Sequence, residues 1–333
     1  ADIERAAALT PDNPDAWFQL GNLQHEFYGY RDARASYERA VALRPDFIEA
    51  WFNLGNTCKD SYQFDEALRA YDHALEVQPD FFEAQSNRGF VLFKMQRPME
   101  ALEAYDRAMA LDDSSPDLWF NRGSTLEQLY RFSEATECYR RARELKPDAS
   151  SAAWNDALLK LRQGDFANGW PAYESRWATE QMRTQVRQFL QPLWLGQQSL
   201  QDKTILIHAE QGFGDTLQFV RYLPQVAALG ARVILEVPPA LVRLLAKVPG
   251  AAQVISSDQF MRPGFDYHCP LMSLPLACKS FSEADIPRAP YLLPDADAWA
   301  AWLQRLPRNR SLRVGLVWAC LLYTSPSPRD LST

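Results

Sequence analysis

The segment WFQLGNLQHEFYGYRDARASYERAVALRPDFIEA, residues 17–50, is one copy of a 34-residue pattern that decides the fold of the N-terminal half. Trp17, Trp51, Gln85 and Trp119 begin successive copies, and a glycine follows each of them by four residues. Three other positions of the pattern hold the same residue in every copy: Ala33, Ala67, Ala101 and Ala135; Tyr37, Tyr71, Tyr105 and Tyr139; and Ala40, Ala74, Ala108 and Ala142. The copies are separated by Pro11, Pro45, Pro79, Asp113 and Pro147. Small residues let two helices approach closely and aromatic residues fill the space between neighbours, so the period predicts a solenoid of helical hairpins.

This pattern resembles the tetratricopeptide repeat, of which residues 1–177 would hold a partial first unit, four full repeats and an irregular capping unit. Residues 2–9 fit the second helix of an earlier unit, so we expect the natural chain to extend upstream. Trp154 restarts the pattern one residue late. Trp170, Tyr173 and Trp177 are expected to form a capping surface that packs on another domain.

Amide side chains recur two residues after each repeat begins, at Gln19, Asn53, Asn87 and Asn121, and the late restart puts Asp156 there in the fifth unit. In this repeat family that position faces the concave groove, where a carboxamide can donate to and accept from a peptide backbone. The series resembles the asparagine ladder in the superhelical arm of protein O-GlcNAc transferases. It predicts a peptide or protein partner bound at Asn53, Asn87 and Asn121. The alternative is that these amides solvate a helix face or tie adjacent hairpins together.

The second half alternates short apolar runs with amphipathic runs, after a junction at 178–203 that is read as a linker. Strands are expected at 204–208, 232–237, 253–256 and 265–270, with helices at 215–229 and 239–248. This alternation predicts an α/β domain with a parallel sheet, for which 3-2-1-4 is the usual strand order. Gly212 and Gly214 lie in the first strand-to-helix turn, where positive φ or close approach of another molecule is expected, and Asp215 or Thr216 could cap the helix.

Four segments of the second half carry a resemblance to glycosyltransferase family 9, the heptosyltransferase group: AEQGFGDTLQFVRYLP, ARVILEV, FDYHCPLMSLP and RVGLVWA. The resemblance covers roughly 192–319 and implies a glycosyltransferase B fold. Residues 204–312 would form its Rossmann-like N-terminal domain, on the acceptor side. Residues 313–319 would be the first strand of a second Rossmann domain, which holds the nucleotide-sugar donor and is otherwise missing. Residues 320–333, CLLYTSPSPRDLST, resemble translated sequencing-adapter sequence and are expected to be a non-native tail. Because the donor-binding domain is missing, the chain as given should be inactive.

The resemblance assigns a catalytic base to Asp215, because the family's proposed base directly follows the glycine turn. The alternative role is a carboxylate that stabilises the helix N-terminus. Strand order predicts that His208 and His268 end at one crevice, where they could bind acceptor hydroxyls or a leaving phosphate, or simply hydrogen-bond at strand ends. The full set of predicted acceptor- or phosphate-binding residues is His208, Glu210, Gln211, Gly212, Gly214 and His268.

Composition limits the other possibilities. A net charge of −7 without clustered Lys or Arg argues against nucleic acid, and no apolar run has the length of a membrane span. Five scattered cysteines favour a reducing compartment, so a cytoplasmic protein is expected. The spacing of His208, His268 and Cys269 fits no zinc pattern, and a nucleotide-sugar is the one expected cofactor, with no metal.

Three functions follow from these patterns. The first is a glycosyltransferase fragment whose repeat arm recruits a protein or glycan acceptor, and the alternative is a repeat scaffold for protein interaction with a non-catalytic α/β domain. A dinucleotide-binding oxidoreductase is the third, since Glu236 ends the second strand where a ribose-binding acid would lie. Leu217 in the third-glycine position argues against it.

Overall fold

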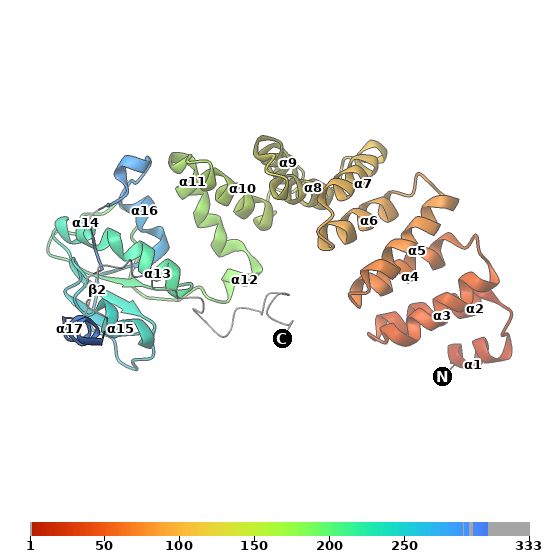
Figure 1. Cartoon of the computed structure of the whole chain (residues 1–333), viewed down its shortest axis with the longest axis horizontal. Coiled ribbons are helices and arrows are strands. Elements are labelled where there is room, and N and C mark those ends of the chain that lie inside the picture. Colours follow the sequence, from red (N-terminus) through yellow and green to blue (C-terminus); the bar gives the residue numbers. More distant parts are fainter. Residues whose placement is uncertain (1, 289, 293–295, 306–333) are drawn as a thin grey trace. The chain divides into compact units, whose positions relative to one another are not determined.

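The computed structural model describes residues 2–288, 290–292 and 296–305, and the chain divides into two compact units, Ala1–Leu159 and Lys160–Thr333 (Figure 1). The division falls inside helix α10, so the segment expected to cap the array is compact with the second unit, and the extent of the repeat array to Trp177 stays a prediction. The expected strand at 313–319 and the tail at 320–333 lie outside the described residues.

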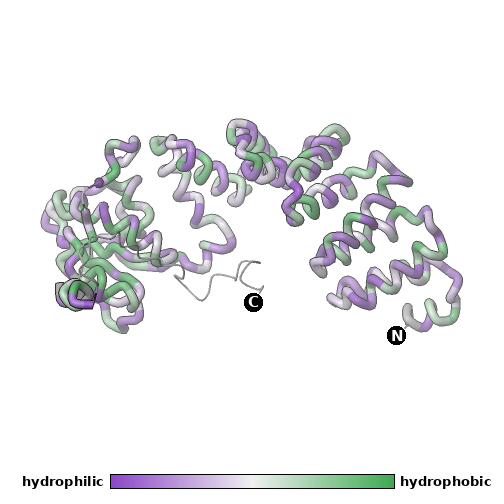
Figure 2. Tube along the Cα trace, viewed as in Figure 1, coloured by the Kyte–Doolittle hydropathy of each residue, from purple (hydrophilic) through white to green (hydrophobic). Residues whose placement is uncertain are grey.

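The first unit consists of paired helices of 13 and 14 residues, preceded by a shorter one. Hydrophobic and hydrophilic residues are interspersed along these helices, as helices with one buried and one solvated face require (Figure 2). The helices are α1 (Asp2–Leu9), α2 (Pro14–Glu26), α3 (Tyr30–Leu43), α4 (Ile48–Asp60), α5 (Phe64–Val77), α6 (Phe82–Lys94), α7 (Pro98–Leu111), α8 (Pro116–Gln128), α9 (Phe132–Leu145) and α10 (Ser150–Arg162).

The repeated glycines and tyrosines determine how closely the two helices of a hairpin approach. A Cβ added to Gly55 would lie 2.5 Å from Cε1 of Tyr71, and the other three copies show the same contact at 2.6–2.8 Å. The repeated tryptophans fix the loop that enters each hairpin: Nε1 of Trp51 donates to the carbonyl of Pro45 at 2.8 Å. The predicted hairpin solenoid is therefore the observed fold of this unit.

The turn inside each hairpin has a left-handed residue. Tyr28, Tyr62, Gln96 and Tyr130 have φ of 59–61°, a region that bulky side chains rarely adopt. Gly164, one repeat further along, has φ of 82° at the corresponding position. Non-glycine residues at these turns therefore strain the backbone.

The second unit is an α/β unit with a four-stranded parallel sheet in the order β3-β2-β1-β4, as the sequence predicts. Its helices and strands are α11 (Phe166–Tyr173), η1 (Glu174–Ala178), α12 (Glu180–Arg183), β1 (Thr204–His208), α13 (Phe213–Phe219), η2 (Val220–Tyr222), α14 (Leu223–Ala228), β2 (Arg232–Val237), α15 (Pro239–Leu245), β3 (Gln253–Ser256), β4 (Tyr267–Pro270), η3 (Leu271–Ser273), α16 (Leu274–Ala277), η4 (Glu283–Asp285) and α17 (Ala296–Arg305). β4 begins two residues later than expected, and the expected helix at 215–229 is three shorter pieces.

The segment expected to be a linker is packed into the second unit. Trp194 is buried, its backbone N–H donates to the carbonyl of His268 at 2.8 Å, and Leu193 forms a parallel bridge to the same residue. Phe189 packs on the sheet face that carries Leu206. These contacts give the apparent linker a structural role that its irregular composition does not reveal. No helix among the described residues combines the length and the apolar character that crossing a bilayer requires.

Candidate functional site

Two groups of polar side chains are candidates for function: the amide series of the repeat unit and the polar cluster at the carboxyl ends of the strands. In the repeat unit, Nδ2 of Asn53 donates to Oδ1 of Asn22 at 2.9 Å, and that oxygen also accepts from the hydroxyl of Tyr37 at 2.7 Å. The next step is the same, because Asn87 and Tyr71 both donate to Oδ1 of Asn56 at 2.8 Å. Asn53 and Asn87 thus tie adjacent hairpins together.

The next pair of the series, Asn121 with residue 90, does not form the same hydrogen bond. Phe90 occupies the position that corresponds to Asn22 and Asn56, so no carboxamide oxygen is available there. The hydroxyl of Tyr105 is buried without a hydrogen-bond partner. Among the described residues, the half-buried side chain of Asn121 also has no hydrogen bond. The side-chain donor and acceptor groups of Asn121 are therefore not used within the described part of the chain.

The fifth unit corrects one prediction. The late Trp154 led us to place Asp156 in the amide series, but Asn155 holds that position, with Nδ2 3.3 Å from the hydroxyl of Tyr139. Asp156 is 3% exposed and accepts a hydrogen bond from Nη1 of Arg143 at 3.3 Å. The 34-residue register continues through the fifth unit, and the tryptophan alone is displaced by one residue.

In the second unit, the two histidines at the strand ends lie together, with Nε2 of His208 3.3 Å from Nδ1 of His268. The ring of Phe189 covers both, with centroid distances of 5.4 and 4.6 Å. Burial, then the charge of Arg187 and the adjacent His268, lower the pKa of His208 to about 3. Burial and Arg187 also lower the pKa of His268, so the pair is neutral at neutral pH. Nδ1 of His208 is buried without a partner.

Glu210 forms a buried ion pair rather than lining an open surface. Its oxygens accept from Nη2 of Arg176 at 3.0–3.1 Å and from the backbone N–H of Met272 at 3.2 Å. Arg176 is fully buried and also bonds Ser273 at 2.7 Å. Burial raises the pKa of Glu210 to about 6 against the opposing attraction of Arg176. This geometry gives Glu210 a role in joining η1 to the sheet, and its predicted ligand contact stays a prediction.

The glycine turn differs from the expected one. Gly212 is the N-cap of α13 with φ of −63°, and Gly214 is not among the positive-φ residues, so neither glycine is required by the backbone. A Cβ at Gly214 would meet nothing within 4 Å, and one at Gly212 only a carboxylate oxygen of Asp215 at 3.6 Å. Asp215 lies in the first turn of α13 and not at its N-cap, and Gln211 precedes that cap, half-buried. The turn therefore borders open space.

Two further expectations concern other ligands. Glu236 is 1% exposed and each of its oxygens accepts from an arginine, Arg187 or Arg262, a buried arrangement that argues against the ribose contact of the oxidoreductase hypothesis. Within the described ranges, no group of three His, Cys, Asp or Glu side chains is arranged to hold a metal ion.

The geometry first defines a class: a solenoid of helical hairpins joined to an α/β unit. Comparison with known families then identifies the hairpins as tetratricopeptide repeats, matched at residues 55–96 by one profile and at 29–58, 87–150 and 120–181 by another. The N-terminal unit is thus a tetratricopeptide repeat array, the architecture of a protein-interaction scaffold. These matches give no support to the glycosyltransferase family 9 resemblance.

Several known proteins align with about half of this chain. FlbA from Caulobacter vibrioides is 28% identical over 194 residues, which is 53% of this chain and 32% of FlbA, so the chain spans about a third of that relative. Among solved structures, YrrB aligns at a TM-score of 0.46 with 20% identity over 55% of this chain and 93% of YrrB. MamA from Desulfovibrio magneticus RS-1 aligns at 0.47 with 15% identity, over 52% of this chain and 97% of MamA. PilW aligns at 0.46 with 23% identity, over 53% and 79%.

The sequence reasoning missed the acceptors of the series, Asn22 and Asn56. Both follow the first residue of their repeats by five, so the same 34-residue comparison that revealed Asn53 and Asn87 would have found them. It would also have shown the substitution by Phe90.

Proposed function

We propose that the repeat array binds an extended polypeptide along the face that carries the amide series, and that Asn121 is its main contact with the peptide backbone. The observation that supports this assignment is the difference between equivalent asparagines. Nδ2 of Asn53 and Asn87 is used inside the protein, whereas the side chain of Asn121 has no hydrogen bond among the described residues. A carboxamide can donate to a peptide carbonyl and accept from a peptide N–H at the same time.

A half-buried amide without partners is a favourable place for such a contact. The side chain is partly desolvated before the ligand arrives, so a peptide hydrogen bond there loses less to competing water than one at a fully exposed site. An extended peptide exposes its own N–H and C=O groups along its length. The site therefore suits main-chain recognition, which tolerates variation in the peptide's side chains.

Asn121→Ala tests this proposal, with Asn87→Ala as the matched control. Peptides selected for binding to the whole chain from a random display library should lose about tenfold in affinity with Asn121→Ala, because one paired backbone contact is removed. The stability of Asn121→Ala should equal that of the wild type, since no internal bond is lost. Asn87→Ala should lower stability, because Oδ1 of Asn56 then loses a donor. Unchanged peptide affinity in Asn121→Ala, or failure to select any peptide, would refute the assignment.

A second candidate function belongs to the α/β unit. The strand order, the open glycine turn and the two histidines at the strand ends favour a ligand at this edge, where open parallel sheets bind theirs. The Rossmann-like assignment, the glycosyltransferase role and Asp215 as base are proposals that rest on the sequence resemblance. A nucleotide-sugar hydrolysis assay on the complete protein, wild type against Asp215→Asn, tests them. Loss of activity with retained folding would support the base, and equal activity would exclude it.

A further inference from the structure

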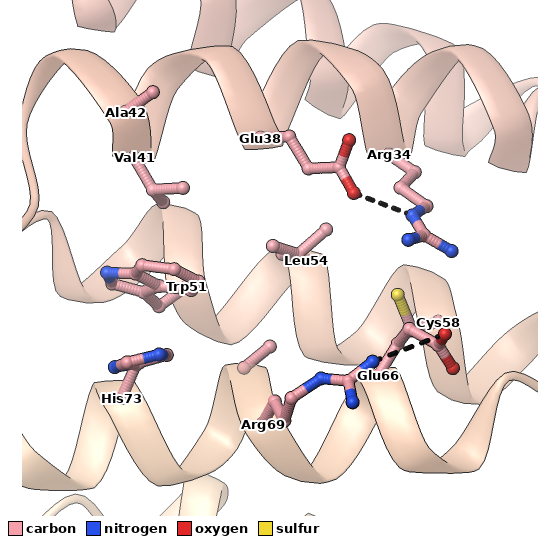
Figure 3. A pocket seen from close by; sticks show the side chains of 11 residues that line it. Arg34, Glu38, Val41, Ala42, Trp51, Leu54, Cys58, Glu66, Arg69 and His73 are labelled. Carbon is pink, nitrogen blue, oxygen red and sulfur yellow. Dashed lines mark hydrogen bonds and ion pairs between the residues drawn. The ribbon is translucent and has the colours of Figure 1, made fainter.

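Helices α3, α4 and α5 line an open pocket of about 380 Å³ (Figure 3). Trp51, Leu54 and Cys58 of α4 form one side of it. The other helices contribute Arg34, Glu38, Val41 and Ala42 from α3 and Glu66, Arg69, Ala70 and His73 from α5. Successive helical residues are about 100° apart, so positions 51, 54 and 58 lie on the side of α4 opposite to Asn53 and Asn56. The pocket is therefore a different surface from the amide series.

The neighbouring repeats show why this space is open. Arg88 and Arg122 occupy the positions that correspond to Leu54, and their Nε atoms bond Asp72 and Asp106 at 2.7 Å. Both aspartates occupy the position that corresponds to Glu38. The positions equivalent to Cys58 hold the fully buried side chains Leu92 and Leu126. In α4 both side chains are shorter, so the volume that an arginine stem and a leucine fill elsewhere is left vacant.

Glu38, the acidic residue of this repeat, has one carboxylate oxygen that can accept a further hydrogen bond. Nε of Arg34 donates to Oε1 of Glu38 at 2.7 Å, and no donor reaches Oε2 among residues 2–288. Arg69 approaches Oε1 of Glu66 at 3.3 Å, and its own side chain is 68% exposed. In Figure 3 these two carboxylates lie on opposite sides of the apolar surface made by Leu54 and Cys58. Burial raises the pKa of the Cys58 thiol to about 11, so that surface is uncharged at neutral pH.

We propose that this pocket binds an arginine side chain of a partner polypeptide, with its aliphatic stem on Leu54 and Trp51 and its guanidinium on Glu38. The array itself supplies the template, because Arg88 and Arg122 place the same group beside the same acidic position. A guanidinium satisfies a carboxylate through paired N–H donors and lays its stem along apolar surface. The partner's arginine therefore takes the place that Arg88 and Arg122 occupy in the next two repeats and that Leu54 leaves open here, and it bonds the oxygen of Glu38 that Arg34 does not use.

Calorimetric titration of the whole chain with the peptide acetyl-Ala-Leu-Arg-Leu-Ala-amide tests the proposal. The matched probe has citrulline in place of arginine. Citrulline has nearly the same shape as arginine but carries no charge. We expect the citrulline peptide to bind about tenfold more weakly, because the charge-assisted bond to Glu38 is lost. Leu54→Arg fills the pocket with the residue that Arg88 and Arg122 provide, and should weaken the arginine peptide by about tenfold or more. Leu54→Met, which keeps the pocket open and uncharged, should bind it as the wild type does.

A further variant keeps the test decisive if Leu54→Arg fails to fold. The Glu38 side chain is 50% exposed, so Glu38→Gln should retain the fold while weakening the arginine peptide by about tenfold. Equal binding of the two peptides, indifference to both pocket variants, or no binding of the arginine peptide would each overturn the proposal. Asn121→Ala leaves this pocket intact, so binding here is distinguished from binding along the amide series.

Discussion

Tyr71→Phe and Tyr105→Phe should change stability in opposite directions, although the two tyrosines hold equivalent positions and are both fully buried. The hydroxyl of Tyr71 donates to Asn56 at 2.8 Å, so its removal should cost about 1 kcal/mol, the net contribution of one hydrogen bond. The hydroxyl of Tyr105 has no partner, and a buried unsatisfied hydroxyl costs about 1–3 kcal/mol. Tyr105→Phe should therefore stabilise the repeat unit by about 1–2 kcal/mol.

Urea unfolding of the two variants, followed by circular dichroism, measures this difference. The slope of free energy against urea concentration should stay constant while the midpoint moves down for Tyr71→Phe and up for Tyr105→Phe. Tyr139→Phe is a further control, since that hydroxyl bonds Ser124 at 3.3 Å and Glu127 at 3.1 Å, and it should resemble Tyr71→Phe. If Tyr105→Phe were destabilised as much as Tyr71→Phe, the conclusion that the Tyr105 hydroxyl has no hydrogen-bond partner would be wrong.

Three other perturbations have expected outcomes. Tyr62→Gly should raise the free energy of unfolding, measured by urea titration, by about 1 kcal/mol, because φ of 61° strains a tyrosine. Gly164 holds the corresponding turn position of a later repeat. A lower free energy of unfolding would show that the turn is not strained. Gly55→Ala should destabilise the unit by about 1–3 kcal/mol, since the new Cβ would lie 2.5 Å from the Tyr71 ring, and a wild-type thermal midpoint would contradict that packing. For His208, the folded pKa of about 3 lies below the ordinary 6.5, so stability present above pH 6.5 should fall as pH drops toward 3, by on the order of 3 kcal/mol at pH 4. His208→Leu should flatten that acid limb, and an unchanged pH profile would disprove the assignment.

The repeat period predicted the first unit well because every hairpin repeats the same contacts. A glycine against a tyrosine recurs at each step, and the spacing alone places them on facing helices. The period holds in the fifth unit as well, where it places Asn155 in the amide series. The prediction of Asp156 was wrong because it followed the displaced Trp154 and not the period.

The second unit was predictable in its sheet and less so in its surroundings. Alternating apolar runs predicted the strands, and the strand order usual for such sheets predicted that His208 and His268 lie together, as they do. Contacts between distant segments have no local signature, so the burial of Arg176 against Glu210 and the packing of Trp194 could not be read from the sequence. Positive φ at the glycine turn is not observed, because Gly212 adopts φ of −63°, which any residue can reach, whereas the close approach of another molecule stays a prediction.

The most direct test of the account follows the side-chain amide resonances of the asparagines by NMR while a selected peptide is added. The amide group of Asn121 should shift and become protected from solvent exchange on binding, because it gains hydrogen bonds to the peptide backbone. The amide of Asn87, already bonded to Asn56 at 2.8 Å, should change much less. A peptide that binds while the Asn121 resonances stay at their free positions would contradict the claim that this residue is the main backbone contact.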